Sequence, residues 1–445
     1  MIKHIVRVVL VVVVLAAIVL VWLGRPDKAR LSLADVTGAL PQITAPRNQI
    51  IPTMDVAKGT GWPAGQKPTA AAGLQVAAFA AGLDHPRWLY VLPNGDVLVA
   101  ETNAPPSSGG GITGFVARHL MDKGGAGVPS ANRITLLRDA NHDGVAESRS
   151  VLIAGLNSPF GMALMGGYLY IGDTDAVVRV PFTPGQTRIT AKPEKIVDLP
   201  HGGLHWARNV IAAPDGQSLF VTVGASTNVA DNGMDAEDHR ADILQVNPAT
   251  KTERIYAAGM RNPNGLAIDP QSGRLWAAVN ERDMMGSDLA PDYISAVELG
   301  DHFGWPWYYW GGYPDKRVDP PNPALQQYAK RPDYAMGPHV AALGLAFSQG
   351  SNLGSRFADG VFVGEHGSWN RKPPSGYKVV YVPFAPTGFP APGVKPIDVL
   401  GGFLSADGDK AYGRPVGVAI GPGGGLLVAD DVGNTVWRVS AAASR

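Results

Sequence analysis

The sequence predicts an all-β protein, a six-bladed β-propeller that follows an N-terminal transmembrane helix. A phrase made of an apolar turn, a strand, a Pro/Gly turn and a second strand recurs along the chain. Such self-similarity over several tens of residues, with two strands in each copy, is typical of a propeller. An uncharged run precedes all copies, and a stretch rich in Pro, Ala and Thr separates it from them.

Six copies of the phrase indicate six blades. The copies begin at Leu83, Leu156, Leu204, Met260, His339 and Tyr412. In a propeller the inner strands converge on a central channel, and the loops that lead into them line one mouth of it. The opening residues of each copy differ between copies, so we expect the functional site at that mouth.

Residues 1–24 are expected to form an uncleaved signal anchor. Lys3 and Arg7 precede an uncharged run from Val8 to Gly24, which is about long enough to cross a bilayer. No clear small-x-small cleavage site precedes Arg25, which favours an anchor over a removed signal peptide. The positive charges before the run favour a cytoplasmic N-terminus. We therefore expect a single crossing of a bacterial inner membrane, with the remaining chain in the periplasm.

Two regions follow the anchor. Residues 25–72 are expected to be a linker between membrane and propeller, or alternatively to supply an extra strand that docks on its outside. Residues 73–445 are expected to form the propeller and to carry catalysis. The chain has no Cys, which excludes disulfides, thiolate metal sites and covalently attached c-type haem. Its 38 basic and 38 acidic residues balance, which argues against nucleic-acid binding.

The densest group of candidate residues follows Met260. Arg261 and Asn262 stand just before an expected inner strand, so their side chains can reach the channel. A guanidinium group is always charged and offers paired donors to a carboxylate or a developing oxyanion. The plain alternative for Arg261 is an ion pair with a neighbouring blade.

An oxygen-rich loop follows the second strand of the same copy. It contains Glu281, Arg282, Asp283, Ser287 and Asp288. Hard oxygen ligands, including loop carbonyls, suit calcium better than zinc. The loop is therefore a candidate calcium site, and a solvated turn is the alternative.

His205 is the candidate general base. Alignment of the copies places it at the mouth, and a neutral imidazole there can accept a proton near physiological pH. A zinc pair with His201 and a purely structural histidine are the alternatives. Arg208 and Asn209 follow directly and could serve the same pocket.

A second candidate calcium loop lies in the first copy. Asp139, Asn141 and Asp143, followed by Gly144, match the front half of an EF-hand-like loop, but Ser150 stands where the final Glu would be. The flanking residues are strand-like, so a β-hairpin loop is expected. A structural calcium site and a plain turn remain alternatives.

The last two copies add cations to the channel. Arg371 or Lys372 comes from one copy and Arg414 from the next. Several positive charges around one axis are unfavourable unless an anion lies among them. A polycarboxylate cofactor would account for this arrangement.

The order of the phrases HWARNVIAAPDG, GMRNPNGLAIDP, ERD, FGWPW, GEHGSWNR and GRPVGVAIGPGG resembles the pyrroloquinoline quinone (PQQ)-dependent sugar dehydrogenases. Within the soluble glucose dehydrogenase superfamily it is most similar to the sorbosone dehydrogenase-like and aldose sugar dehydrogenase branch, over roughly residues 75–442. The resemblance implies a propeller that holds PQQ and calcium at the channel mouth and oxidises an aldose-type sugar or a related alcohol or aldehyde. Electrons would pass to a quinone or to a soluble redox protein.

The resemblance also implies roles for individual residues. His205 matches the base that takes the hydroxyl proton of the sugar as hydride moves to the quinone. Arg261 and Asn262 match residues beside the reacting quinone carbonyl, where Arg261 stabilises negative charge. Arg414 matches an arginine that binds a PQQ carboxylate. Calcium, placed against the loop that begins at Glu281, would act as a Lewis acid.

This sequence departs from the glucose enzymes of the superfamily at several positions. Leu204 replaces an Asp just before the catalytic His, so another group must orient His205 or its basicity will differ. Leu156 replaces a Gln on the substrate side, and Val416 replaces a second arginine of the final blade. The lysine that contacts the cofactor has no single counterpart, and the remaining cofactor-binding candidates are Arg371, Lys372 and His339.

Two other classes of function remain open. A calcium-dependent propeller hydrolase of the lactonase kind needs a carboxylate-rich channel floor, and the cations expected in this channel argue against it. A propeller without chemistry could serve as a binding module. Cofactor binding separates both from the dehydrogenase.

Overall fold

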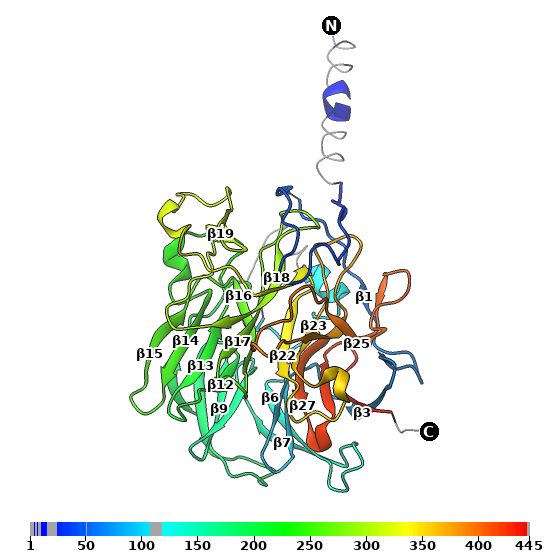
Figure 1. The fold of residues 1–445 in the computed structure, drawn as a ribbon, viewed down its shortest axis with the longest axis vertical. Helices are drawn as coiled ribbons and strands as arrows, with labels where there is room; N and C mark the ends of the chain where they lie inside the picture. Colours follow the sequence, from blue (N-terminus) through cyan, green and yellow to red (C-terminus); the bar gives the residue numbers. More distant parts are fainter. Residues whose placement is uncertain are drawn as a thin grey trace.

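Each copy of the repeated phrase forms one antiparallel sheet in the computed structural model, which describes residues 4, 7, 10–15, 25–49, 51–106 and 118–442 (Figure 1). Within these residues six sheets of at least four strands are the blades, and two short two-stranded sheets accompany them. The predicted six-bladed propeller is confirmed.

The strands follow the chain blade by blade. Blade 1 contains β4 (Pro86–Val91), β5 (Val97–Glu101), β6 (Arg133–Arg138) and β7 (Ser148–Ala154). Blade 2 contains β8 (Met162–Met165), β9 (Tyr168–Asp173), β10 (Ala176–Pro181) and β11 (Glu194–Asp198). Blade 3 contains β12 (Val210–Ala212), β13 (Leu219–Val223), β14 (Asp242–Asn247) and β15 (Thr252–Ala257).

The second half of the ring is built in the same way. Blade 4 contains β16 (Asn262–Ile268), β17 (Leu275–Asn280), β18 (Pro291–Val297) and β21 (Tyr334–Pro338). Blade 5 contains β22 (Ala342–Phe347), β23 (Gly360–Glu365), β24 (Lys378–Pro383) and β25 (Ile397–Gly401). Blade 6 contains β27 (Pro415–Ile420), β28 (Leu426–Asp430), β29 (Thr435–Ala441) and, from the start of the domain, β3 (Leu74–Ala81).

Smaller elements lie between the blade strands. The short 3-10 helices are η1 (Met234–Glu237), η2 (Pro323–Leu325), η3 (Ser355–Phe357) and η4 (Pro422–Gly424). An insertion between β18 and β21 carries η2 and the hairpin of β19 (Tyr308–Tyr309) and β20 (Tyr313–Pro314).

The first strand of each blade lies at the centre of the ring. The inner strands β4, β8, β12, β16, β22 and β27 contact one another in this order, and β27 returns to β4. The second strand of a blade packs between neighbouring blades on both faces, so it consists of buried residues throughout, as in β5, β13 and β28. A continuous apolar run of this length is typical of a fully buried strand.

The two ends of the propeller meet in one sheet. Strand β3 pairs antiparallel with β29, with Thr435 opposite Ala81 and Ala441 opposite Leu74. Phe79 of β3 is 1% exposed and packs with apolar residues of blades 1 and 6. The ring is therefore closed by strand pairing between the beginning and the end of the domain.

The loops before each inner strand and those between the second and third strands of a blade share one side of the ring, which we call the mouth face. This follows from the alternating strand direction within each blade. The N-terminal segment that begins at residue 25 enters on this side, at the top of Figure 1. The hairpin loops between first and second or between third and fourth strands lie on the opposite face, except for the insertion between β18 and β21, which returns to the mouth face and contacts Arg282 there.

Residues 25–49 and 51–72 pack against the propeller. Strand β1 (Lys58–Gly59) pairs parallel with β26 (Lys410–Ala411), and β2 (Thr69–Ala70) extends blade 5 at β25. An isolated bridge joins Gly38 to Ala335.

The anchor expected at residues 1–24 lies mostly outside the described residues. Residues 10–15 are helical. In the portions of the chain that the structure describes, no helix has the length and apolar character needed to span a bilayer.

We predict that truncating Phe79 opens the ring. Phe79→Ala should lower the free energy of unfolding by about 3–5 kcal/mol, because a buried ring is lost at the closing strand pair. Chemical denaturation followed by circular dichroism measures the change. Gln75→Ala on the exposed side of the same strand is the control, with an expected change within about 0.5 kcal/mol. Equal effects of the two substitutions would contradict the role of β3 in closure.

Candidate functional site

His205 lies at the mouth, in the loop that leads into β12. Its Nδ1 is 2.6 Å from the carbonyl oxygen of Ala225. A carbonyl can only accept, so Nδ1 carries the proton and Nε2 is the acceptor nitrogen of the neutral ring. Burial, assisted by the charge of Arg261, lowers the pKa of His205 to about 3.

The carbonyl of Ala225 orients His205, a role that the side chain of Leu204 does not fill. Leu204 is 63% exposed and makes no contribution to orienting the imidazole. Gly224, next to Ala225, lets the ring approach the neighbouring blade. A Cβ at this position would lie 2.4 Å from Oδ1 of Asn262 and 2.6 Å from Cβ of His205. Glycine at 224 is therefore required for His205 and Asn262 to share the mouth.

Arg261 forms its ion pair within its own blade, and its Nε also donates to the carbonyl of Asn228 in blade 3 at 3.3 Å. Its Nη1 donates to the carbonyl of Glu281 at 2.8 Å, and its Nη2 donates to Oδ2 of Asp283 at 3.0 Å. Only 4% of Arg261 is exposed. The guanidinium is thus fixed in place before any ligand arrives.

Asp283 also contacts His339 at the start of blade 5. The distance from Oδ1 of Asp283 to Nδ1 of His339 is 3.2 Å, and Nε2 of His339 is 3.2 Å from the carbonyl of Gly286. Burial alone would raise the pKa of Asp283, but Arg261 and His339 bring it below the usual range. Burial would lower the pKa of His339, but the hydrogen bond and charge of Asp283 raise it. Blades 3, 4 and 5 therefore bring His205, Arg261, Asp283 and His339 together.

The predicted calcium loop does not bring its side chains to one point. Oε2 of Glu281 accepts from Nε of Arg282 at 2.9 Å, and Arg282 is fully buried. The other guanidinium nitrogens of Arg282 donate to the carbonyls of Pro306 and Tyr308 in the insertion. A guanidinium has no lone pair for a metal, and the loop carboxylates are already paired with cations. These side chains stabilise the loop instead.

A second charged group faces the channel from blades 1, 5 and 6, and we call it the Asp431 cluster. Oδ2 of Asp431 lies 2.6 Å from Nη1 of Arg87, 2.8 Å from Nε2 of His366 and 3.5 Å from Nε2 of His85. Arg414 joins the cluster by donating to the carbonyl of His366 at 3.0 Å.

Buried histidines characterise the Asp431 cluster. Burial, with the charge of Arg414, lowers the pKa of His366 to about 3. Burial lowers the pKa of His85 to about 4. Burial would raise the pKa of Asp431, yet the two histidines and Arg87 hold it well below the usual range. Asp431 is therefore the single negative charge among these groups.

The two charged groups border the same channel. The guanidinium carbon of Arg87 lies 5.8 Å from the ring centroid of Trp206, the residue after His205. The sequence interpretation missed His85, Arg87 and Asp431. The first two occupy the opening of copy one, where His205 stands in copy three, so the alignment of copies contained that signal. Nothing in the local sequence marks Asp431 as their shared partner.

Arg371 and Lys372, the two candidates to replace the lysine that contacts the cofactor in the glucose enzymes, have different surroundings in the structure. Arg371 is buried and donates from Nε to the carbonyl of Ser287 at 3.0 Å. Lys372 is half-exposed, with Nζ 3.9 Å from Oδ2 of Asp55 in the N-terminal segment. Arg371 lies against the loop after β17, whereas Lys372 points toward residues that precede the propeller.

The N-terminal segment braces the loop that carries Asp283. Oδ2 of Asp27 accepts from the backbone of Ser287 at 2.6 Å, and Oδ2 of Asp288 accepts from the backbone of Arg30 at 2.9 Å. Nη2 of Arg47 lies 2.8 Å from Asp27 and 2.9 Å from Asp288. Residues far apart in sequence thus hold the mouth loops of blades 4 and 5.

The hairpin loop between β6 and β7 gathers carboxylates on the opposite face of the ring. One ligand oxygen from each of Asp139, Asp143 and Glu147 lies within 4.8 Å of the others. It is the one group of three metal-ligating side chains in the part of the chain that the structure describes. Glu147, rather than a residue at position 150, completes the set. Oδ1 of Asn141, in the same loop, accepts from the backbone of Asp143 at 2.9 Å.

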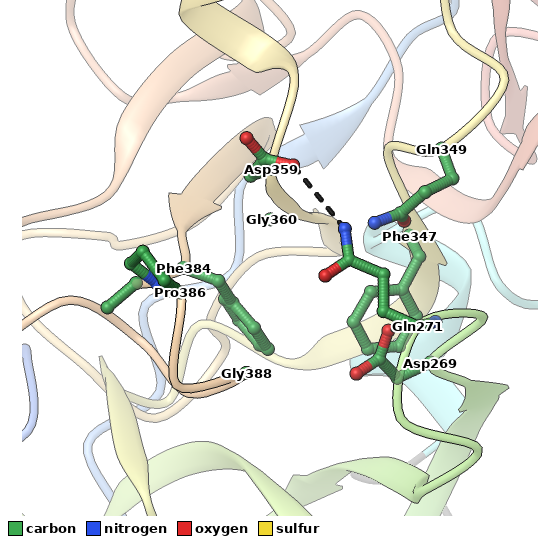
Figure 2. Close-up of a pocket in the computed structure, with 10 residues that line it drawn as sticks. Asp269, Gln271, Phe347, Gln349, Asp359, Gly360, Phe384, Pro386 and Gly388 are labelled. Atoms are coloured by element: carbon green, nitrogen blue, oxygen red, sulfur yellow. Dashed lines mark hydrogen bonds between the residues drawn. The ribbon is translucent and has the colours of Figure 1, made fainter.

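Two surface pockets lie away from these groups. Figure 2 shows one of about 250 Å³ on the opposite face, where the side chains of Gln271 and Asp359 approach each other and Phe347 and Phe384 line the cavity. A second pocket, of about 480 Å³, lies between blades 2 and 3 and includes His201. Neither contains His205 or Arg261. Among the described residues, His201 and His205 belong to no group of three metal ligands.

Comparison with known proteins gives matches over most of the propeller. The family model for glucose/sorbosone dehydrogenases matches residues 171–366, and a TrAA12-like family model matches residues 322–442. An uncharacterized protein of Borreliella burgdorferi is 30% identical over 296 residues, which are 64% of this chain and 76% of that protein.

A fungal relative has a described activity. The PQQ-dependent pyranose dehydrogenase of Coprinopsis cinerea is 26% identical over 357 residues, 70% of this chain, and the chain spans 44% of that protein's length. The holo form of its PQQ domain superposes with a TM-score of 0.66 at 20% identity, over 86% of this chain and all of that one. This likeness supports the propeller fold.

We predict that His205 stays neutral down to about pH 4. Its pKa of about 3 means that protonation begins only as the pH falls toward that value. NMR of the histidine rings in the cofactor-free protein measures this, with spectra of His205→Gln and His339→Gln as assignment controls. His339 should instead hold its proton to a higher pH than a free histidine, because Asp283 stabilises the charged ring. A His205 signal that titrates near pH 6.5 would show that the imidazole is not buried beside Arg261.

Proposed function

We propose that this chain, which the glucose/sorbosone dehydrogenase family model matches over residues 171–366, is a PQQ-dependent oxidoreductase of sugars in the soluble glucose dehydrogenase superfamily. The observation that supports this most directly is the arrangement at the mouth. A neutral imidazole with a free acceptor nitrogen stands beside a fixed guanidinium group, and further cations face it across the channel.

The donors at the mouth suit a polycarboxylate cofactor such as PQQ. Among the described residues, the guanidinium groups of Arg87 and Arg261 pair with the carboxylates of Asp431 and Asp283, and Arg414 donates to the carbonyl of His366. Nε of Arg87 is buried without a partner. An anion would complete this set, because guanidinium groups bind carboxylates with paired hydrogen bonds. In our proposal Arg261, Asn262 and Arg414 hold PQQ, with Arg371 and His339 nearby. Lys372 is the less suitable of the two lysine replacements because it points toward Asp55.

His205 acts as the general base in this proposal. Nε2 takes the proton of the substrate hydroxyl that is oxidised, while Nδ1–H remains bound to the carbonyl of Ala225. PQQ, when bound, supplies the acceptor for the hydride that leaves the same carbon. The low pKa of His205 keeps the ring neutral, with Nε2 unprotonated, at any pH above about 4.

Arg261 supplies electrostatic stabilisation. Its bonds to Glu281 and Asp283 fix the guanidinium group before reaction, so no reorganisation is needed when negative charge develops beside it. His339 holds the second oxygen of Asp283 and thereby fixes the orientation of the pair. The substrate class within the sugars, aldose or sorbosone-like, follows from the resemblance of the motifs and belongs to the proposal.

We predict that turnover requires His205 and Arg261. Full-length protein loaded with PQQ and calcium should reduce an artificial dye with an aldose from a test panel. His205→Ala should lower kcat about 100- to 10,000-fold through loss of the base. Arg261→Ala should lower it about 100- to 1,000-fold through loss of charge stabilisation. His239→Ala, at the outer edge of blade 3, is the control and should retain activity.

The same assay tests the main proposal against its alternatives. Absence of PQQ binding would rule out the dehydrogenase and leave the hydrolase or the binding module. Unchanged activity in His205→Ala would assign the base to another residue.

We further propose that calcium binds the β6–β7 hairpin in a structural role. Asp139, Asp143 and Glu147 provide the hard oxygen ligands that calcium prefers. This loop lies on the face opposite the mouth, so an ion there would not touch the substrate. Calcium at the mouth, as the resemblance implies, would have to use backbone carbonyls, since the side chains of Glu281 and Asp283 are paired with arginines.

We predict that calcium raises the thermal stability through this hairpin. At a calcium concentration about 100 times Kd, binding to the folded state adds about 2.7 kcal/mol. Asp143→Asn should remove the calcium-dependent part of the rise in Tm, as measured by calorimetry. Asp215→Asn, in another loop of the opposite face, should leave it unchanged. A calcium effect that survives Asp143→Asn would place the ion elsewhere.

We propose that residues 1–24 anchor the protein in the bacterial inner membrane with the propeller in the periplasm. The uncharged run from Val8 to Gly24 after Lys3 and Arg7 supports this proposal. The electron acceptor would then be a membrane quinone or a soluble redox protein.

A further inference from the structure

We propose that the mouth face of the propeller lies against the lipid bilayer, so that the catalytic channel opens toward the membrane surface. This inference rests on the membrane anchor of the proposed function. It goes beyond anchoring because a tethered propeller could hold its mouth in any direction.

The chain leaves the mouth face directly into the expected anchor. Asp27 is bonded to Ser287 of the loop after β17, and Ala29 donates from its backbone to the carbonyl of Lys372 at 2.8 Å. Asp27 lies three positions after Gly24, the last residue of the apolar run, with Arg25 and Pro26 between them. Three residues span at most roughly 11 Å when fully extended. The mouth loops therefore cannot lie far from the membrane end of the anchor.

The segment that connects them is attached rather than free. Arg47 joins Asp27 and Asp288 in one ion-pair group, in which Asp288 has only 1% of its side chain exposed. Arg30 is bonded to Asp288 through its backbone. These contacts fix the direction in which the chain approaches the propeller, so that the anchor constrains orientation as well as distance.

Seven exposed apolar side chains lie on the mouth face, and others, such as Val145, Val151 and Ile255, lie elsewhere on the propeller. Leu204 is 63% exposed, Met54 44% and Trp369 38%, and they come from three different segments around the mouth. Other exposed apolar residues of mouth loops and of the N-terminal segment are Ile51, Met121, Val128 and Met234. Single exposed apolar residues are ordinary on soluble proteins, but seven on one face, drawn from five segments, form a surface suited to lipid.

Cations beside these residues suit an anionic headgroup layer. Arg25, Lys28 and Arg30 are exposed at the point where the chain reaches the mouth, and Lys372 is half-exposed next to Trp369. Trp together with Lys and Arg is the combination that marks a membrane–water interface. A bilayer therefore matches both the apolar and the charged residues of this face.

This orientation bears on the electron acceptor. Oxidation of one substrate hydroxyl to a carbonyl releases two electrons and two protons, and one quinone of the benzoquinone class takes up both pairs to become a quinol. A quinone dissolved in the bilayer would meet the channel mouth without a carrier protein. The inference thus favours the first of the two acceptors named above.

The absence of cysteine makes a direct test possible. Trp369→Cys and Leu204→Cys report on the mouth face, and Val145→Cys, 45% exposed in the β6–β7 loop, reports on the opposite face. Each full-length variant would carry an environment-sensitive fluorophore in vesicles of phosphatidylcholine and phosphatidylglycerol. Doxyl-labelled lipids and aqueous iodide serve as the two quenchers.

We expect doxyl lipids to quench the labels at 369 and 204 at least threefold more than the label at 145, and iodide to show the reverse order. Equal lipid quenching at all three positions would overturn the proposal. So would protection from iodide at 369 and 204 without lipid quenching, which would indicate a protein partner on this face. Loss of the protein from vesicles washed with carbonate would overturn both the proposed orientation and the proposed membrane anchor. The measurement needs no PQQ, so it stays independent of whether the sugar oxidation is found.

Discussion

The pairing of β3 with β29 is the interaction on which the rest of the molecule depends. Without it the six sheets would form an open arc, and the inner strands would not surround an axis. Closure converts residues that are distant in sequence into neighbours around one mouth. His85 in blade 1 and Asp431 in blade 6 lie on the two sides of this seam and still come within 3.5 Å. The chemistry of the mouth is thus a product of ring closure as much as of any single motif.

The charges at the mouth are organised in two similar units. In each, one buried carboxylate holds one guanidinium group and at least one imidazole: Asp283 with Arg261 and His339, and Asp431 with Arg87 and His366. A buried cation without a partner would be strongly unfavourable, so the carboxylates make the arginines tolerable in the absence of a ligand. They also restrict the guanidinium groups to fixed positions. The site therefore combines an affinity for anions with low conformational freedom.

The sequence predicted the blades because their signal is local. Alternation of strands and Pro/Gly turns can be read within about twenty residues, and each copy repeats it. The sequence predicted His205, Arg261 and Arg414 as site residues for the same reason, because each stands within the first three residues of its copy. The Asp431 cluster, the binding of Arg47 to Asp288 and the contacts of Arg282 with Pro306 and Tyr308 depend on which loops meet in space. Similarly, the hairpin at Asp139 was found, but the contribution of Glu147 depends on how the turn folds back.

The partner of His205 has a consequence of its own. A side-chain partner such as a carboxylate can be deleted by one codon change, whereas the carbonyl of Ala225 belongs to the main chain and is present with every residue type. The backbone carbonyl at position 225 therefore fixes the tautomer of the His205 ring, and no substitution at position 225 removes this carbonyl. The vulnerable position is Gly224, where any side chain would push His205 and Asn262 apart. Substitutions at position 225 therefore keep the carbonyl that orients His205, whereas substitutions at position 224 would displace His205 and Asn262.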